Sequence, residues 1–359
     1  MRKLQPSNLE NIQQLFTEKT GVALHISRKT TLIPAKRVLI LATIVTTFLA
    51  LTCFALAEEL KDTDILANFF FRRQDATLSD GQNEYIESGT AVIGESVTQN
   101  GFTVTVRSAI TDGTLAYLLL DITAPENMDI ARLPLAVDAE LSVPSPEDQN
   151  SPHISSISTS CIAIDDHDEQ RNTAAMLLQY HIYPFLDSQF SLADGKARAL
   201  RLNEIFYHET DYPYEKQLLA KGEWAFSVTF TTVNDRETEL LTAPVYASCH
   251  QISGKKVEAS IFSLRLKGLS ATVYYTLPAA EVQEASDFGV LTFITTDGNR
   301  IFAYPQKAGQ TVQVAGDYFV PGTDAHYCAY ELSAPADAEQ IAAVQLQDLT
   351  VEIRPQHNN

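Results

Sequence analysis

The sequence lacks the short motifs that mark nucleotide, zinc and hydrolase chemistry. It contains no Gly-x-x-x-x-Gly-Lys or Gly-x-Gly-x-x-Gly phosphate loop and no Gly-x-Ser-x-Gly elbow. His208-Glu209 is followed by Thr-Asp-Tyr, so the second histidine of a His-Glu-x-x-His zinc motif is missing. The other histidines are scattered without a close pair. We therefore expect no enzymatic activity and no cofactor, and the sequence offers no catalytic residue.

Basic side chains are scarce beyond the N-terminal segment. Residues 1–37 carry seven Lys or Arg against two Glu, whereas residues 58–359 carry nineteen basic and forty-three acidic side chains. Such asymmetry is typical of segments that lie in different surroundings. An acidic excess of this size repels polyanions, so we expect no binding of nucleic acid by the larger segment.

Charge, glycine and proline are all absent from residues 38–57, which read VLILATIVTTFLALTCFALA. A helix of this length, at about 1.5 Å per residue, covers the roughly 30 Å hydrocarbon core of a bilayer. Lys36 and Arg37 precede the stretch and Glu58 follows it, so the positive-inside rule places the N-terminus in the cytoplasm. We expect a single-pass protein of the cell membrane with its C-terminal ectodomain outside.

A cleaved signal peptide is the alternative interpretation of this stretch. Ala55-Leu56-Ala57 before Glu58 has the small-x-small form of a signal peptidase site. Cleavage there would release the ectodomain as a secreted or surface protein.

Cysteine is also rare. Cys53 lies in the predicted span, and Cys161, Cys249 and Cys328 lie outside it. Because three is an odd number, at least one of these cysteines has no disulfide partner within the chain. Cys249 and Cys328 both fall in strand-like stretches. The sequence leaves open whether they form a disulfide or remain two buried thiols.

The cytoplasmic tail contains a helix signal. Ser7-Asn8-Leu9-Glu10 has the form of a capping box, and apolar residues then repeat at helical spacing. These residues are Leu9, Ile12, Leu15 and Phe16. The resulting short amphipathic helix either contacts a cytosolic partner or lies on the inner membrane surface.

Beyond the span, the period of the apolar residues changes from helical to alternating. Ile65, Leu66, Phe69 and Phe70 fall on one helical face. Asp80-Gly81 is expected to break that pattern, and a further helical turn is expected at Glu84–Glu87. From about residue 91 the alternation is typical of strands, with hairpin turns expected at Asn100-Gly101 and Asp297-Gly298. Residues 125–155 are expected to form a loose connection.

The chain is therefore predicted to be mainly β, with two β-sandwich ectodomains on one transmembrane helix. The predicted segments are a basic cytoplasmic tail with a short helix (1–37), the transmembrane helix (38–57), a helical stalk (58–90), a β-sandwich (91–236) and a C-terminal β-sandwich (237–355).

Two clusters are candidates for binding. One is an acidic run that consists of Asp165, Asp166, His167, Asp168 and Glu169. Its carboxylates could bind Ca²⁺, although the glycine and the final glutamate of an EF-hand loop are missing, and a solvated acidic loop explains the same residues.

The other is aromatic: Tyr207, Tyr212 and Tyr214 lie on an expected loop between strands. They form either a binding patch for an extracellular ligand or a cap on the end of the sandwich.

Two stretches carry a resemblance to a known group of proteins. They are Leu4-x-Pro6-Ser7-Asn8-Leu9-x-x-Ile12-Gln13-x-Leu15-Phe16-x-x-Lys19-Thr20-Gly21-Val22 and Ile93-Gly94-x-Ser96-Val97-Thr98. With the basic flank and the span, they resemble Firmicutes membrane proteins that carry an extracellular domain of unknown function with immunoglobulin-like architecture. Some of those proteins resemble anti-sigma factors. The resemblance covers the whole chain and implies envelope sensing, with a sigma factor as a cytosolic partner of the tail.

Overall fold

The computed structural model describes most of the chain beyond the predicted span. The described residues are 62–74, 76–143, 154–164, 170–184, 190–208, 215–231, 236–251, 254–278, 286–305, 317–319 and 323–353. The prediction of a mainly β protein is confirmed, because this part consists of antiparallel strands with few helices. No helix within these ranges is long and apolar enough to cross a membrane, and the predicted span at 38–57 lies outside them.

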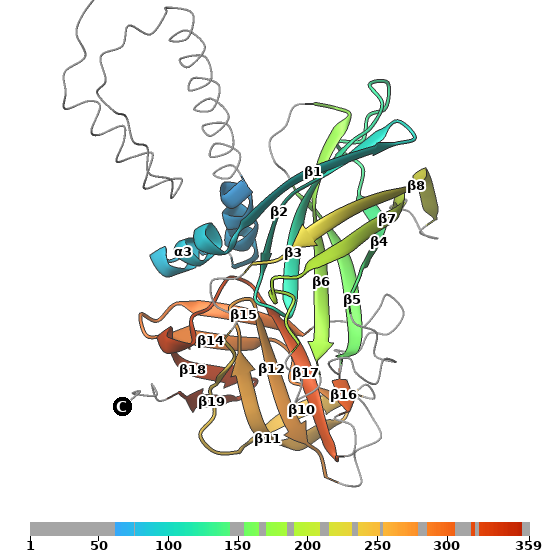
Figure 1. Cartoon of the computed structure of the whole chain (residues 1–359). Coiled ribbons are helices and arrows are strands. Elements are labelled where there is room, and N and C mark those ends of the chain that lie inside the picture. The colour runs from blue at the N-terminus through green and yellow to red at the C-terminus, as the bar shows by residue number, and fades with distance from the viewer. Residues whose placement is uncertain are drawn as a thin grey trace, which may run out of the picture. The chain divides into compact units, whose positions relative to one another are not determined.

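In the described part of the chain, two helical segments precede the first strand. Residues 62–74 are helical, and α3 (Asp80–Gly89) follows after a short connection (Figure 1). The four apolar residues that the sequence places on one helical face are all buried, namely Ile65, Leu66, Phe69 and Phe70. They pack with side chains of β2 and β3 in one hydrophobic cluster.

The sequence predicts a break at Asp80-Gly81, but these residues form the first turn of α3. The further turn predicted at Glu84–Glu87 lies within the same helix. The reason is the capping box of Ser79 and Gln82. The Gln82 N–H donates to the Ser79 hydroxyl at 3.3 Å, and the Ser79 N–H donates to the Gln82 side chain at 2.8 Å. These bonds satisfy backbone donors that a helix start otherwise leaves unpaired.

The strands up to residue 229, which we call the first β-module, form two sheets. The larger pairs in the order β1 (Ala91–Gln99), β2 (Phe102–Thr111), β3 (Leu115–Thr123), β6 (Thr173–Pro184) and β5 (Ile154–Ile164). The smaller pairs in the order β4 (Leu135–Leu141), β7 (Ala197–His208) and β8 (Lys216–Thr229). The predicted turn at Asn100-Gly101 joins β1 to β2, and both residues have the positive φ that such a turn requires.

Two strands of this module were missed in the sequence. β4 falls inside the stretch 125–155 that we expected to be a loose connection, and β5 begins at its end. Five of the eleven residues of β5 are Ser or Thr, and its four isoleucines do not alternate regularly, so the sequence pattern did not indicate a strand. Pairing with β6 along its whole length makes it a strand.

A single hydrophobic core lies between the two sheets. Val104 and Leu118 enter it from the larger sheet, and Leu202 and Trp224 enter it from the smaller one. Trp224 is fully buried, and its indole N–H donates to the carbonyl oxygen of Phe102 at 3.2 Å. Tryptophan is therefore placed where its one polar atom finds a partner.

β1 covers the edge of β8 with side chains in place of a strand ladder. The Gln99 amide donates to the Glu223 carbonyl and accepts from the Glu223 N–H at 2.9 Å. Glu95 accepts from the Ser227 N–H at 3.0 Å. Such bonds occupy backbone groups that an open edge would offer to another chain.

The strands from residue 238 onward, which we call the second β-module, form one continuous sheet. They are β9 (Thr238–Glu239), β10 (Val245–Gln251), β11 (Lys256–Leu266), β12 (Ser270–Thr276), β13 (Ser286–Asp287), β14 (Leu291–Thr295), β15 (Arg300–Pro305), β16 (Asp317–Phe319), β17 (Ala325–Leu332), β18 (Ile341–Leu346) and β19 (Leu349–Glu352), with a short 3-10 helix at Ala338–Gln340. The main path is β13-β10-β11-β12-β17-β15-β14-β18-β19. The predicted hairpin turn at Asp297-Gly298 joins β14 to β15.

This sheet curls around its own core. Ile261 and Val273 from one part of the path meet Phe293 and Val344 from the other part in one buried cluster. Within the described ranges, β15 pairs with β17 through three residues, Ala303 to Pro305, and this pairing links the two parts. The pairing therefore resembles two sheets joined at one corner. The immunoglobulin-like topology stays a prediction.

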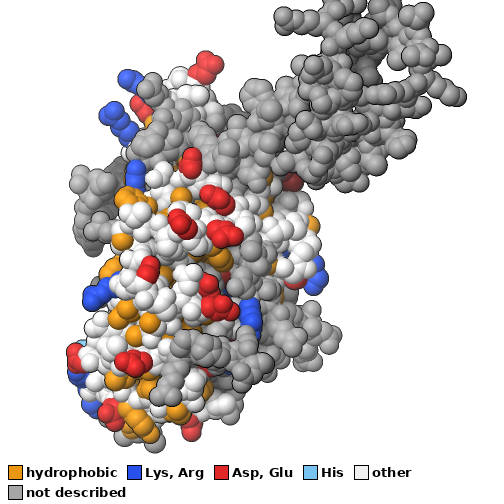
Figure 2. Space-filling model, turned by 90° about the vertical axis from the view of Figure 1, so that its left-hand side faces the viewer, with side chains coloured by type: hydrophobic (Ala, Val, Ile, Leu, Met, Phe, Trp, Pro, Cys, Tyr) orange, Lys and Arg blue, Asp and Glu red, His pale blue; other side chains and the backbone are white. Residues whose placement is uncertain are grey.

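The surface of the described part reflects the acidic composition. Figure 2 shows the face that carries α3 and the β14–β18 side of the second β-module, where acidic side chains lie among apolar ones down the middle.

Candidate functional site

Many of the residues that the sequence singled out lie outside the described part of the chain. They are Leu9, Ile12, Leu15 and Phe16 of the tail, the acidic residues Asp165, Asp166, Asp168 and Glu169, and the aromatic residues Tyr212 and Tyr214. The roles assigned to them stay predictions. Within the described ranges, no group of three or more His, Cys, Asp or Glu side chains is arranged to hold a metal ion.

Tyr207, the described member of the predicted aromatic patch, is half-buried and packs against the core of the first β-module. The residues on either side of it in β7 share the opposite face of the strand. There the Phe206 ring lies 5.3 Å from the His208 ring and 4.0 Å from Lys216 Nζ. Among the described residues at this end of β7, Phe206, His208 and Lys216 therefore lie together, and Tyr207 contributes to the core.

The described cysteines are thiols. Cys249 and Cys328 are buried in the core of the second β-module. The Cys249 S–H donates to the Val257 carbonyl at 3.5 Å, and the Cys328 S–H donates to the Tyr275 hydroxyl at 3.9 Å. The structure therefore favours two buried thiols over the disulfide that the sequence left open.

The most connected polar site lies where the helical segment meets both β-modules. Arg73 of the helix, Tyr117 of β3 and Glu331 of β17 contact one another there. The Arg73 guanidinium donates to the Glu331 carboxylate and, at 3.0 Å, to the Tyr117 hydroxyl. The Tyr117 hydroxyl in turn donates to Glu331.

Burial fixes the protonation of this site. Tyr117 is fully buried, and desolvation together with the Glu331 carboxylate raises the pKa of its phenol well above the ordinary value. The phenol therefore stays a hydrogen-bond donor. Removal of one of these three side chains would leave a buried charge or polar group without its partner.

A second ion pair holds Asp62, the first described residue of the same helix. Arg107 of β2 donates to the carboxylate of Asp62, which is almost fully buried. Its other terminal nitrogen lies 3.3 Å from both carboxylate oxygens of Asp121 in β3. The segment 62–74 is thus held at both ends, by Arg107 at Asp62 and by Glu331 at Arg73.

Asp112 joins the two β-modules directly. This fully buried residue lies in the turn between β2 and β3, where its Oδ1 accepts from the backbone N–H groups of Thr114 at 2.9 Å and Leu115 at 2.8 Å. Its Oδ2 accepts from the N–H of Leu269 at 3.1 Å and from the hydroxyl of Ser270 at 2.6 Å. One carboxylate therefore shapes its own turn and holds the turn before β12.

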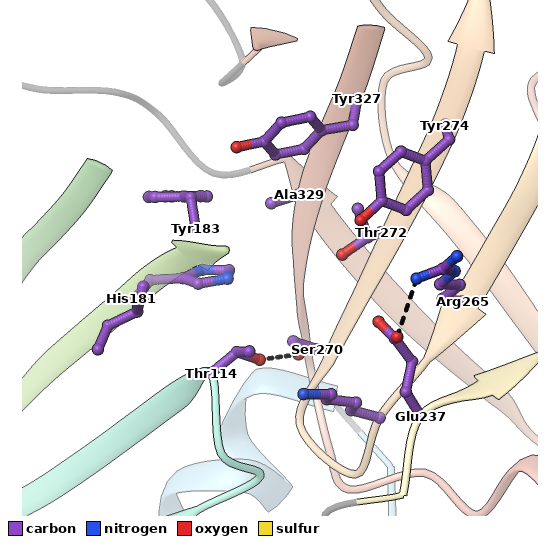
Figure 3. A pocket seen from close by; sticks show the side chains of 12 residues that line it. Thr114, His181, Tyr183, Glu237, Arg265, Ser270, Thr272, Tyr274, Tyr327 and Ala329 are labelled. Carbon is purple, nitrogen blue, oxygen red and sulfur yellow. Dashed lines mark hydrogen bonds and ion pairs between the residues drawn. The ribbon is translucent and has the colours of Figure 1, made fainter. Parts of the chain in front are cut away.

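Beside Asp112, an aromatic cleft runs along the seam between the modules (Figure 3). Tyr183 of β6 packs with Tyr274 and Tyr327 of the second β-module, and Arg265 pairs with Glu237 at 3.1 Å. The three rings are nearly fully buried, and the cavity volume of about 20 Å³ has room for about one water. The cleft is therefore a packed seam and not a pocket for an organic ligand.

None of these junction residues was identified in the sequence. A signal existed, because Asp112, Tyr117 and Glu331 are polar residues inside or beside strongly apolar strands, where an unpaired polar group is unfavourable. Their partners are up to 258 residues away along the chain, as for Arg73 and Glu331. No local pattern connects such pairs.

These observations define a mainly β, antiparallel protein whose first helical segment is ion-paired to two β-modules. Residues 27–124 match the model of a family described as Domain of unknown function (DUF4179). The matched segment includes Arg73, Asp112 and Tyr117, and it ends before the residues of the second β-module that contact them.

No curated protein matches the chain. Among solved structures, the chain is similar to the conserved domain protein from Bacillus anthracis, with 13% sequence identity and a TM-score of 0.43. That similarity covers 72% of this chain and 76% of the other.

Proposed function

We propose that this chain is a membrane-anchored, non-enzymatic sensor or interaction protein of the bacterial cell envelope. In this proposal residues 38–57 span the membrane, the N-terminal tail contacts a cytosolic regulatory protein such as a sigma factor, and the β-modules bind a ligand outside. Both β-modules are proposed to be immunoglobulin-like sandwiches. Their enclosed cores and antiparallel pairing support that assignment.

The observation that carries the proposal is the double attachment of residues 62–74. The described part of this helix starts at Asp62, five residues after the predicted span ends. Asp62 is bonded to the first β-module, and Arg73 is bonded to both modules. A rearrangement between the modules would therefore displace the helix, and a rigid helix would pass that displacement towards the membrane. A helix that only linked the β-modules to the membrane would not require bonds to both of them.

Topology is the first test. Inside-out and right-side-out membrane vesicles that contain the full chain are treated with protease. We expect the tail to be cleaved only in inside-out vesicles, and the β-modules to be attacked only from the outer side. Digestion of both parts from the same side would overturn the proposed anchor.

Signalling is the second test. A photo-crosslinking residue at position 12 reports cytosolic contacts, and a deletion of residues 4–22 reports the effect on transcription. We expect a specific crosslinked partner, and altered transcription in the deletion strain. Unchanged transcription together with no specific crosslink would contradict the signalling part of the proposal, whatever the result of the topology test.

A released structural or adhesive surface protein is the second candidate, favoured by the small-x-small pattern at Ala55 to Ala57. Mass spectrometry of the protein from cells decides between the two. A mature N-terminus at Glu58 supports release, whereas an intact tail supports the anchored sensor.

A further inference from the structure

A groove opens between α3 and the second β-module. Its volume is about 370 Å³, within the usual range for sites that bind a ligand. One wall is the exposed side of α3, and the other consists of the turn between β14 and β15 and the 3-10 helix at Ala338–Gln340. These elements lie on the face that Figure 2 shows.

The floor of the groove is apolar and held in place. Ile301, Pro335 and Ala336 line it, and all three are buried. The Gln82 side chain of α3 donates to the Pro335 carbonyl at 2.9 Å and so fixes the helix against the floor. On the same helix, Tyr85 lies against Gly268, where a Cβ would overlap its ring. The groove is therefore preformed.

The rim of the groove is acidic. Glu84 of α3 faces it from one wall, and Asp297, Asp337 and Glu339 face it from the other. All four residues are exposed. The lining contains no Lys, Arg or His, and none of the four carboxylates forms an ion pair with another residue in the described part of the chain. Like charges around one groove repel each other, and a bound cation relieves that repulsion.

Two of these carboxylates are held in position by their own backbone. Asp337 accepts from the N–H of Glu339 at 3.0 Å. Asp297 accepts from the hydroxyl of Thr295 and from the N–H of Asn299 at 3.3 Å, and these bonds lower the pKa of its carboxyl. Both carboxylates are therefore oriented, and that of Asp297 keeps its negative charge at mildly acidic pH.

We infer that this groove binds a peptide segment of another protein that carries Lys or Arg on both sides of an apolar side chain. The apolar side chain would lie on Ile301 and Ala336, and the flanking cations would reach Glu84 on one wall and Asp337 or Glu339 on the other. This inference rests on the proposed function, since it names the partner class for the extracellular binding step.

Other classes of ligand fit less well. Nucleic acid and the anionic surface of a membrane would be repelled by the rim. A bare metal ion would use none of the apolar floor, and within the described ranges no set of three His, Cys, Asp or Glu groups converges on one point. A peptide uses both the floor and the rim.

The test uses the full-length chain in lipid nanodiscs and a fluorescent nonapeptide with a central Leu flanked on each side by two Lys. Two matched peptides replace the central Leu by Ala or the Lys residues by Glu. Spermine serves as a cation that has no apolar side chain. The groove variant is E84Q/D297N/D337N/E339Q, in which the Asn side chains keep the acceptors for the turn and the cap. The control variant E126Q/D129N/E258Q/E352Q makes the same change of net charge at exposed positions elsewhere.

We expect the groove variant to bind the Lys-Leu peptide at least about tenfold more weakly than the native chain, a loss of about 1.4 kcal/mol. The control variant should change the affinity by less than about twofold, because exposed charges distant from the groove are screened by salt. The Ala and Glu peptides should both bind more weakly than the parent. Circular dichroism of both variants checks that they remain folded.

Three results would overturn the inference. They are an equal loss of affinity in the two variants, binding of spermine or the Ala peptide as tight as that of the parent peptide, and no measurable binding by the native chain. These outcomes are distinguishable from failure of the proposed function, because the vesicle and crosslinking tests do not involve the groove.

Discussion

The hydroxyl of Ser270 donates to the carboxylate of Asp112 over 2.6 Å, although the two residues are 158 positions apart. Asp112 belongs to a turn of the first β-module, and Ser270 begins β12 of the second. The same carboxylate also satisfies the backbone of its own turn. Local geometry and the joining of the modules therefore depend on one side chain.

Replacement of Asp112 should separate these two roles. In D112N the amide oxygen still accepts within the turn, but its NH₂ group faces the N–H of Leu269, which loses its acceptor. We expect D112N to lower the free energy of unfolding by about 2 kcal/mol, and D112A to lower it more, because each unsatisfied buried group costs about 1–3 kcal/mol.

Urea unfolding of the full-length chain, followed by Trp224 fluorescence, measures both effects. D129N at an exposed position is the control, and we expect it to stay within about 0.5 kcal/mol of the native chain. A value for D112N as small as that of the control would contradict the role of Asp112.

The contact of Arg73 with Glu331 should show strong coupling. R73M leaves the Glu331 carboxylate largely buried without its cation, and we expect a loss of about 3 kcal/mol. In R73M/E331Q no charge is left uncompensated, so the double variant should be more stable than the sum of the single variants predicts. A double-mutant cycle by urea unfolding measures the coupling energy. Additive losses would show that the two side chains do not interact.

Alkaline pH should destabilise the β-modules through buried tyrosines. Burial raises the pKa of Tyr117, Tyr180 and Tyr274 above the ordinary value of 10.0, and nearby acidic groups add to the effect. The folded state thus retains protons that the unfolded chain loses. The associated stability is fully present below about pH 10 and decreases as the pH rises above it.

Absorbance at 295 nm and circular dichroism, recorded together from pH 8 to 13, test this expectation. Part of the phenolate signal should appear only as the chain unfolds. Y180F removes one of these phenols, so its stability should fall less steeply with pH than that of the native chain. Complete phenolate absorbance in a chain that is still folded would contradict the prediction.

The three cysteines beyond the predicted span should react in a fixed order. Cys249 and Cys328 are buried, and Cys161 is half-buried with a thiol pKa that desolvation raises. In a C53A background at pH 7.5, we expect a thiol reagent to modify Cys161 slowly and the other two only after unfolding. Labelling of three thiols without reductant in the unfolded chain confirms the reduced state, and recovery of one thiol would show a disulfide.

Local signals in the sequence were sufficient for some elements and insufficient for others. The turns at Asn100-Gly101 and Asp297-Gly298 were predictable because the conformation of such turns depends on a few adjacent residues. β5 was missed because its sequence has no clear strand pattern, and these residues form a strand through their pairing with β6. Asp80-Gly81 was misinterpreted because the cap at Ser79 outweighs the low helix propensity of glycine.

The sequence by itself determined the mainly β class, the apolar face of residues 65–70 and the turns at Asn100-Gly101 and Asp297-Gly298. These follow from periodicity, hydrophobicity and turn residues, which act between neighbours in the chain. Only the tertiary structure decided that Asp112 meets Ser270, that Arg73 meets Glu331, and that four acidic residues surround one groove. Each of these relations joins segments far apart in sequence, and their energy depends on burial and distance that exist only once the chain has folded.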